Sequence, residues 1–509
     1  MFEQNCTIRL LTNLTITLLL TVTLQTALAQ EVSKKEAIDQ IFSKYHEYEG
    51  FQGAVLVAEK GEVIYKKAFG LANREWNIPN QVDSRFDIAS VSKQFTAMLV
   101  MQMYEEGKIH PDSTISSYYP EYRPDIGQQV TIHHLLTHRS GIPNYTSIPY
   151  VWSDSLINRY SQQALVEKFC SGDLEYKPGS RYNYNNTGYF LLSVILEKVS
   201  GRSYAELLQE KILSPLNMQQ SGVDVRDLVI DKRSYGYVIN GTDFENARPM
   251  YMANLQGAGN MYATVDDLYR WDRALYKHKL LSRKGLKEMM TPHSDENDTW
   301  IPPFKNAYGY GVGLAQVPVG EHKDVNMVFH SGHITGYSSF MARFTDDEHL
   351  VVMLSNMGNV STARMNEITQ EVKNVLYNQP YKVPERTLRS SLFKTVRDEG
   401  VEAALAHFNQ LILDFPYEYR DTEEDLHQLG LLLASNRMKE AALQFFKLNA
   451  QLNPGWRSFQ TLADAFYEKG NYGEAGRYYK KSMTLNPKST EKEKNAFNAV
   501  QRSLTSLNQ

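Results

Sequence analysis

Serine and lysine stand three residues apart at Ser90 and Lys93, in the stretch FDIASVSKQFTAM, where an extended segment turns into an apolar helix. Residues at positions i and i+3 lie on one face of a helix, so the amine of such a lysine can take a proton from the serine hydroxyl. The same spacing recurs at Ser391 and Ser489, each followed by a lysine three residues later. The spacing alone therefore identifies no site, and other residues must decide between the three serines.

Two further motifs lie after Ser90 in the chain, whereas no such motif follows Ser391 or Ser489. YNN at residues 184–186 is the only Y-x-N tripeptide of the chain, and HSG at residues 330–332 is its only H-x-G. A serine hydroxyl is a poor nucleophile at neutral pH. It needs a base, a route for the proton to the leaving group and donors for the developing oxyanion. The three motifs in this order favour nucleophilic catalysis at Ser90.

The order S-x-x-K, Y-x-N, H-x-G resembles that of the penicillin-recognising serine hydrolases, which comprise class C β-lactamases, serine D-Ala-D-Ala carboxypeptidases and family VIII esterases. Further resemblances are TIHHLLTHRSGIPNY, GRSYAELLQEKILSPLNMQQSG, LQGAGNMYATVDDLYRWDRAL and VVMLSN. The resemblance covers roughly residues 35 to 378. It implies an α+β fold in which a β-lactamase/transpeptidase-like sheet has flanking helices and an inserted helical lobe.

The resemblance implies which groups react. Ser90 is the expected nucleophile, acylated at the start of a helix. Lys93 is the expected base, because burial and the positive potential of a helix N-terminus can depress the pKa of its amine. Tyr184 is expected to lean over the same cleft and pass the proton to the leaving group, and the backbone N–H groups of Ser90 and His333 to form the oxyanion hole. Outside this pattern, Lys93 could be a solvated charge and Tyr184 a packed aromatic residue.

The resemblance also implies which groups hold the substrate. Asn186 is expected to donate to the amide on the acyl side of the substrate. His330, Ser331 and Gly332 are expected to form the strand edge that faces it. A glycine at position 332 leaves room that a side chain would fill. Outside this pattern, His330 could be an ordinary strand-edge histidine.

Two residues depart from the pattern of the group. Class C β-lactamases usually begin the third motif with lysine, whose charge attracts the β-lactam carboxylate, whereas this chain has His330 there and no K-[ST]-G anywhere. Histidine is mostly neutral near pH 7, which favours the peptidase and esterase branches over β-lactamase activity. Asn185 stands where the group often has serine, and an amide cannot relay a proton as a hydroxyl can.

His134 and His138 indicate a competing metal site, because histidines at positions i and i+4 of a helix can bind zinc. No glutamate follows His134 as in an H-E-x-x-H motif. We therefore expect no metal and no organic cofactor. Both histidines are interpreted as residues that fix the following loop, SGIPNY, beside the cleft.

Length and composition favour a globular protein of two or three domains. The chain has 509 residues, 42% of them hydrophobic and 22% charged. The net charge of -4 gives no reason to expect nucleic acid or an anionic membrane surface as a partner. After the predicted cleavage of residues 1–29, Cys170 is the only cysteine, so no intrachain disulfide can form.

Residues 1–29 are predicted to be a signal peptide. Arg9 precedes an apolar run, and Ala27-Leu28-Ala29 fits the small-residue rule for cleavage. The alternative is a membrane anchor, which the threonines and other polar residues within the run disfavour. We expect an exported protein, periplasmic or secreted, without a membrane span after cleavage.

Residues 31–380 are predicted to form the hydrolase domain. Apolar spacing predicts a helix over 31–48, and GAVLVAEKGEVIYKKAFG predicts two strands around a turn. The pattern is mostly helical from residue 92 to about residue 290 and returns to strands over 307–356. Strands at both ends predict one sheet built from distant segments, with the helical lobe inserted and the active site in a cleft between them.

Residues 386–505 are predicted to form an all-α domain of tetratricopeptide-like (TPR-like) repeats, after the charged joint YKVPERTLR. Glu440-Ala441 recurs at Glu474-Ala475, a period of 34 residues, and about two and a half repeats are visible. Such arrays commonly bind peptides or proteins on a concave face. A protein partner is therefore expected at these repeats, with a capping helical domain that has no partner as the alternative.

Together these features predict an exported serine hydrolase. It would acylate Ser90 with an ester, a D-amino-acid peptide or an amide and then hydrolyse the acyl-enzyme. Within the enzyme class the alternative is β-lactamase or penicillin-binding protein activity. In a different class, the alternative is a non-catalytic scaffold that binds a protein partner through the repeats. No catalytic residue of the pattern is missing, which disfavours the scaffold.

Overall fold

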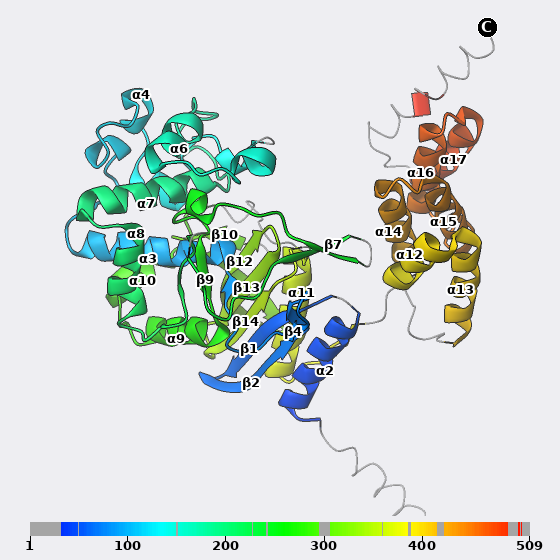
Figure 1. The fold of residues 1–509 in the computed structure, drawn as a ribbon, viewed down its shortest axis with the longest axis horizontal. Helices are drawn as coiled ribbons and strands as arrows, with labels where there is room; N and C mark the ends of the chain where they lie inside the picture. Colours follow the sequence, from blue (N-terminus) through cyan, green and yellow to red (C-terminus); the bar gives the residue numbers. More distant parts are fainter. Residues whose placement is uncertain are drawn as a thin grey trace, which may run out of the picture.

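The computed structural model describes residues 32–500, apart from residues 49, 149–150, 226–227, 241–242, 295–305, 359, 385–387, 415–421, 487–496 and 499. The predicted signal peptide lies outside the described residues. Figure 1 shows a large body that combines strands and helices, and a set of helices formed by the C-terminal part of the chain.

A seven-stranded antiparallel sheet forms the centre of the large body, in the order β10-β11-β12-β13-β14-β1-β2. Its strands are β1 (Gly53–Glu59), β2 (Glu62–Phe69), β10 (Asn306–Tyr308), β11 (Gly313–Val319), β12 (Lys323–Ile334), β13 (Tyr337–Phe344) and β14 (His349–Ser355). β1 pairs with β14 from Gly53↔Ser355 to Ala58↔Leu350. Distant segments of the chain thus meet in one sheet, as the sequence predicts.

Helices cover both faces of this sheet. Successive side chains of a strand point to opposite faces: Ala54 and Leu56 of β1 belong to one core, Val55 and Val57 to the other. The core that holds Val55 and Val57 includes α2 (Lys34–Glu47) and α11 (Thr362–Leu376). The core that holds Leu56 includes α3 (Lys93–Glu105) and α9 (Val265–Tyr276).

The inserted helical lobe lies between β5 (Phe86–Asp87) and the later strands of the large sheet. Its further helices are α4 (Pro124–Gly127), α5 (Ile132–Leu136), α6 (Gln162–Phe169), α7 (Asn186–Ser200), α8 (Tyr204–Leu208) and α10 (Arg283–Met289). The same region contains short strands that the sequence analysis missed: β6 (Gly222–Val223), β7 (Tyr237–Asn240), β8 (Asp243–Asn246) and β9 (Met261–Ala263). Strands of two to four residues are too short to show an alternating pattern.

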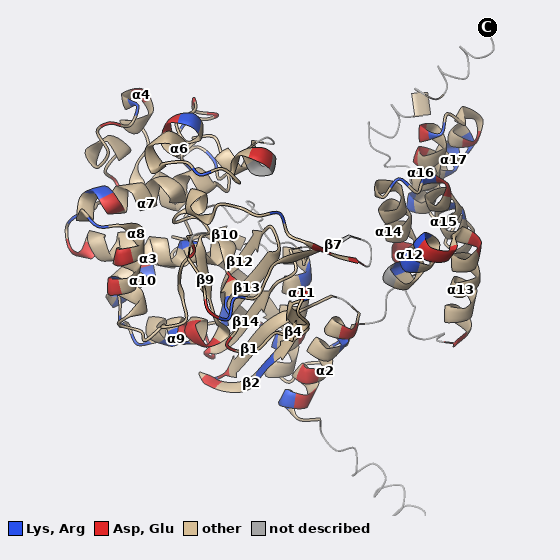
Figure 2. Ribbon diagram, viewed as in Figure 1, with Lys and Arg blue, Asp and Glu red and all other residues tan. Residues whose placement is uncertain are grey.

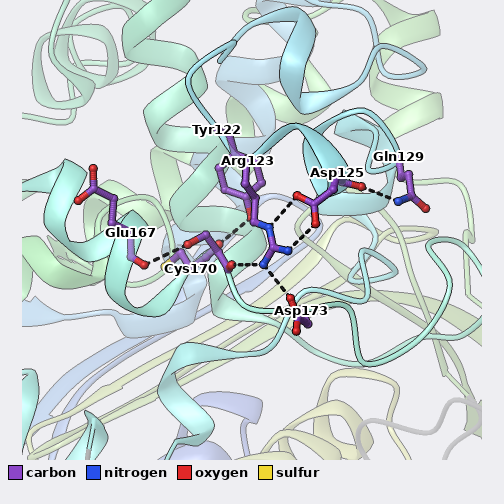
Figure 3. A network of polar contacts seen from close by, with 8 residues as sticks. Tyr122, Arg123, Asp125, Gln129, Glu167, Cys170 and Asp173 are labelled. Atoms are coloured by element: carbon purple, nitrogen blue, oxygen red, sulfur yellow. Dashed lines mark hydrogen bonds and ion pairs between the residues drawn. The ribbon is translucent and has the colours of Figure 1, made fainter.

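A polar network around Arg123 ties two segments of the lobe together (Figure 3). Arg123 donates to the carbonyl of Ser171 and to the carboxylate of Asp173, both at 2.9 Å. Tyr122 donates its hydroxyl hydrogen to the carbonyl of Cys170 at 2.8 Å. The segment before α4 is thereby fixed to the end of α6, and Cys170 is a buried free thiol.

The C-terminal part of the chain is helical in the described residues. It consists of α12 (Leu388–Glu399), α13 (Val401–Asp414), α14 (Thr422–Ser435), α15 (Lys439–Leu452), α16 (Trp456–Glu468) and α17 (Tyr472–Leu485). Glu440 and Glu474, which define the period of 34 residues, lie in the first turns of α15 and α17. Arg397 of α12 forms an ion pair with Asp243 of β8 in the large body.

Both signs of charge are spread over the outer helices, and the strands of the central sheet are mostly uncharged (Figure 2). Within the described residues, no helix combines the length and the apolar character that crossing a membrane requires.

Candidate active site

The candidate nucleophile lies between a short strand and a helix. Ser90 is in the helical turn η1 (Ala89–Ser92), which follows β5 and leads directly into α3. Ala89 has a φ of 46°, a left-handed conformation that costs a non-glycine residue about 1–2 kcal/mol. The turn is held against the sheet, because Ser339 Oγ of β13 donates to the carbonyl of Ile88 at 2.7 Å. Neighbouring elements therefore fix Ser90 at the N-terminus of α3 in spite of the strain.

The amine of Lys93 lies next to Ser90 and is fully buried. Its Nζ is 3.0 Å from Ser90 Oγ, 2.7 Å from Asn186 Oδ1 and 2.7 Å from the carbonyl oxygen of Ala258. Burial lowers the pKa of Lys93 well below its ordinary value of 10.5, because the ammonium form loses its hydration there. The shift favours the neutral amine, which is the form that can accept a proton.

The contacts of Lys93 orient a neutral amine as a proton acceptor. The neutral form has two N–H groups, and the oxygens of Asn186 and Ala258 can only accept them. The remaining lone pair then faces Ser90, whose hydroxyl can donate to it. This is the geometry that a general base for a serine nucleophile requires.

Tyr184 covers the same pair of side chains. Its ring centroid lies 4.9 Å from Lys93 Nζ. Burial raises the pKa of the Tyr184 hydroxyl above its ordinary value, and a side-chain hydrogen bond with Ser90 opposes the rise. Tyr184 therefore keeps its proton near neutral pH and lies where a proton can pass between Lys93 and a leaving group.

The two asparagines after Tyr184 have different contacts. Asn185 is the N-cap of α7 and accepts the N–H of Gly188 at 3.1 Å, while its Nδ2 donates to the carbonyl of Ile142 at 2.5 Å. Both ends of this amide are thus used to hold α7. Asn186 donates from Nδ2 to Thr146 Oγ1 at 2.7 Å. An amide nitrogen has two hydrogens, so Asn186 can donate to a substrate as well.

On the side of β11, β12 extends beyond the end of its neighbour. β11 pairs with β12 from Val319↔Lys323 to Gly313↔Phe329, while β13 pairs with β12 as far as Ile334↔Tyr337. Within the described part of the chain, no strand pairs with residues 330–334 on the β11 side. The backbone of Ser331, Gly332 and His333 is therefore unpaired on that side within the described residues, and Gly332 lies against the turn that holds Ser90.

The side chain of His330 is enclosed rather than presented to a ligand. The residue is 0% exposed, its Nε2 lies 2.9 Å from the hydroxyl of Tyr308 and its Nδ1 lies 2.6 Å from the carbonyl of Ser331. Burial and, second, the nearby charge of Lys93 lower the pKa of His330 to about 3. His330 is therefore neutral at physiological pH, and position 330 offers no fixed positive charge to a substrate carboxylate.

His138 belongs to the site, although the sequence analysis considered it only for metal binding and for the loop after it. Its ring lies 4.4 Å from the ring of Tyr184 and 4.6 Å from that of Tyr308. Its carbonyl accepts the N–H of Asn183 at 2.9 Å and its Nδ1 accepts the N–H of Asn185 at 3.0 Å. His138 thus fixes the backbone on both sides of Tyr184.

His134 has a different environment from His138. Its Nδ1 accepts the N–H of Thr131 at 3.2 Å and so caps the start of α5. The two histidines therefore bind backbone groups of different segments. No feature of TIHHLLTHRSG indicates that His138 lies beside Tyr184.

Gly332→Ala is expected to lower kcat/KM for p-nitrophenyl acetate by about 100-fold, because a displacement near 1 Å at a reacting centre has an effect of this size. A Cβ at position 332 would lie 2.3 Å from the carbonyl oxygen of Ile88 and 2.2 Å from Ser339 Oγ. The turn η1 and β12 would therefore have to separate. Gly259→Ala is the matched control, because its Cβ would meet Ala89 at an ordinary 3.5 Å. Equal rates for the two variants would contradict the close contact.

Known proteins are similar to this chain in sequence and in fold. The sequence profile described as Beta-lactamase matches residues 38–372. Penicillin-binding protein 4* of Bacillus subtilis (strain 168) is 32% identical over 369 residues, which are 70% of this chain and 78% of that protein. The crystal structure of a penicillin-binding protein from Bacillus halodurans superposes with a TM-score of 0.56 at 26% identity, over 65% of this chain and 98% of that one. D-amino acid amidase from Ochrobactrum anthropi shares the fold, with a TM-score of 0.57 at 24% identity, over 68% and 99% of the two chains.

The fold and these matches define a serine hydrolase built on a β-lactamase/transpeptidase sheet. The chain belongs to the Beta-lactamase family. The resemblance inferred from the three motifs is confirmed, and the matched residues contain all three.

Proposed function

We propose that the protein hydrolyses an ester, a D-amino-acid peptide or an amide through an acyl-enzyme at Ser90. The observation that supports this most strongly is the position of Lys93 Nζ, 3.0 Å from Ser90 Oγ and held by two further oxygens. A buried amine without its proton is a suitable base for a serine hydroxyl.

Acylation moves one proton and exchanges one bond. Lys93 Nζ takes the hydrogen of the Ser90 hydroxyl while Ser90 Oγ bonds to the carbonyl carbon of the substrate. The backbone N–H groups of Ser90 and His333 stabilise the oxyanion. The bond from carbon to the leaving group then breaks, and the leaving oxygen or nitrogen receives the proton from Lys93 by way of the Tyr184 hydroxyl.

Deacylation reverses these roles with water as the nucleophile. The water gives a proton to Lys93 through the same contacts as its oxygen bonds to the acyl carbon. The bond between that carbon and Ser90 Oγ breaks, and Ser90 recovers a proton. The carboxylic acid product leaves, and neither a metal nor an organic cofactor takes part in these steps.

A neutral residue at position 330 supports peptidase or esterase chemistry over β-lactamase chemistry. His330 is enclosed and its pKa is about 3, so it does not supply the charge that lysine supplies in class C β-lactamases. We expect measurable turnover of p-nitrophenyl acetate and of D-alanine p-nitroanilide, with nitrocefin hydrolysed at least about tenfold more slowly as judged by kcat/KM. Absorbance assays of the three substrates under one set of conditions test this, and a preference for nitrocefin would contradict it.

Tyr184→Phe is expected to lower kcat by about 10²–10³-fold, because general acid–base groups contribute on this scale. The ring that packs over Lys93 is kept and only the hydroxyl is lost, so the melting temperature should change little. The matched control is Tyr182→Phe, whose ring lies 5.9 Å from that of His138. With p-nitrophenyl acetate, kcat is expected to fall in Tyr184→Phe and to stay at the wild-type value in Tyr182→Phe. An equal fall of kcat in both variants would contradict a role of the Tyr184 hydroxyl in proton transfer.

Further proposals concern the domains of the chain, its export and a protein partner of the C-terminal helices. We propose a signal peptide at residues 1–29, a hydrolase domain at 31–380 and TPR-like repeats at 386–505 that bind a protein partner. The described helices α12–α17 form three consecutive pairs, which supports the repeats. Relatives named as penicillin-binding proteins support export. Penicillin-binding protein activity and a purely scaffolding role are the alternatives.

A further inference from the structure

A cavity lies beside the candidate active site and plays no part in the chemistry described above. Its volume is about 570 Å³, and Asp87, Asp224, Arg233, Ile334 and Tyr337 are among the residues that line it. Asp87 precedes Ser90 by three residues, and Ile334 follows His333 directly. The two chain segments that flank the candidate nucleophile therefore also form the walls of this cavity.

The two segments lie in contact with each other. A Cβ at Gly332 would come within 2.3 Å of the carbonyl oxygen of Ile88, so β12 and the residue before η1 are in contact. Three residues span at most about 11 Å. An acyl group on Ser90 that spans about this distance would therefore reach the Asp87 end of the cavity.

Two buried carboxyl groups form the deep end of this cavity. Asp87 is 7% exposed and Asp224 is 1% exposed. Apart from a proton shared between the two carboxyls, Asp87 Oδ1 and Asp224 Oδ1 have no hydrogen-bond donor among the described residues. Buried carboxylate oxygens without donors are costly, and both belong to residues that line the cavity.

The two carboxyls at the deep end share one ion-pair partner among the described residues. Arg233 is the cation next to them; it forms an ion pair with Asp224 and lies 3.9 Å from Asp87 Oδ1. Burial and the neighbouring Asp224 raise the pKa of Asp87 to about 8. The pair therefore holds a proton near neutral pH that a cationic ligand could replace.

The mouth of the cavity is aromatic. Trp76 is 80% exposed and Tyr235 is 56% exposed, although both are large and partly apolar. Glu75 and Arg248 are exposed lining residues of opposite charge, which cancel at the rim. Aromatic faces attract organic cations, so the mouth and the deep end favour the same kind of ligand.

We propose that this cavity binds an ammonium group on the acyl part of the substrate, between the Asp87–Asp224 pair and the aromatic mouth. The substrates would then be esters or amides of amino acids or peptides with a free amine. The assignment of the amine to the acyl part of a substrate rests on the proposed function. The binding of an amine by the cavity does not depend on that chemistry.

Calorimetric titration of the Ser90→Ala protein tests the cavity without turnover. The ligands are glycinamide, 4-aminobutanamide and 6-aminohexanamide, each beside its N-acetyl derivative, and succinamic acid as a carboxylate of similar length. At least one free amine is expected to bind about tenfold more tightly than its N-acetyl derivative, and succinamic acid more weakly than either. Equal affinities for all amine and acetyl pairs, or tighter binding of the carboxylate, would overturn the proposal.

A variant locates the binding. On the Ser90→Ala background, Asp224→Asn is expected to reduce the tenfold preference to less than twofold. Asp266→Asn, which removes a partly exposed carboxylate of α9 that is paired with Lys66 of β2, is expected to keep it. A preference unchanged by Asp224→Asn would place the amine elsewhere and overturn the proposal. If Asp224→Asn does not fold, the comparison of free amines with succinamic acid in the Ser90→Ala protein still tests whether the cavity prefers amines.

Amine binding and ester turnover together distinguish failure of the cavity proposal from failure of the hydrolase proposal. If the cavity prefers amines while the wild-type protein shows no Ser90-dependent ester turnover, the cavity proposal stands and the hydrolase proposal fails. If turnover depends on Ser90 and no amine is preferred, the cavity proposal fails and the hydrolase proposal stands.

Discussion

Ser90→Ala is expected to lower kcat/KM for p-nitrophenyl acetate by about 10⁴-fold or more, to the background rate of the buffer. Without Oγ no acyl-enzyme can form, and Lys93 has no serine hydroxyl from which to take a proton. Removing one hydroxyl from a partly buried position changes packing little, so the melting temperature should stay within a few degrees of the wild type.

The chain offers a matched control for this experiment. Ser391 has a lysine three residues later, as Ser90 has, and lies in α12 outside the site. Ser391→Ala is expected to keep the wild-type rate. Loss of activity in Ser391→Ala, or full activity in Ser90→Ala, would refute the assignment of the nucleophile.

Lys93→Met is expected to lower kcat for the same ester by about 10³-fold, within the range that removal of a general base produces. Methionine keeps the length and apolar body of the side chain, so the change tests the amine rather than the packing. Loss of the three contacts to Ser90, Asn186 and Ala258 also frees Ser90 from its orientation. Stopped-flow acylation rates separate this step from deacylation.

The pH profile of the wild-type enzyme should identify the same amine. Only neutral Lys93 can accept a proton, so kcat/KM should fall as the pH falls through the pKa of Lys93, which burial lowers well below 10.5. His330 has a pKa of about 3 and cannot cause a fall between pH 5 and 8. In Lys93→Met the acidic limb should disappear. An acidic limb that persists in Lys93→Met would assign the base to another residue.

Sequence patterns were sufficient for the order of the main elements. The strands around Lys60 and the run of strands after residue 306 have clear hydrophobic patterns and turn residues, and both join the predicted sheet. The position of Ser90 before an apolar helix was also readable, because β5, η1 and α3 follow one another in the chain. Sequence patterns therefore predicted the elements whose contacts lie between neighbouring segments of the chain.

Contacts between distant segments were not readable. Nothing in the sequence shows that Ala258 supplies a carbonyl to Lys93 or that Tyr308 bonds to His330, because these pairs meet only in the folded chain. The contact of His138 with Tyr184 is of the same kind. The sequence led us to expect no metal there and a histidine that fixes the loop SGIPNY, but the packing of its ring against Tyr184 depends on the lobe.

The Asp87–Asp224 pair shows the same limit. The two residues are far apart in the sequence, and a strand as short as β6 gave no pattern that could have placed Asp224 beside Asp87. A buried pair of like groups forms only where packing brings the segments together, and single-sequence patterns do not contain this information.

Intact-mass spectrometry after incubation with labelled penicillin and with a fluorophosphonate tests the central claim most directly. The wild-type protein is expected to gain the mass of one acyl or phosphonyl group, located on the peptide that contains Ser90, while Ser90→Ala gains none. An adduct of equal size on Ser90→Ala, or no adduct on folded wild-type protein with either reagent, would contradict the acyl-enzyme mechanism.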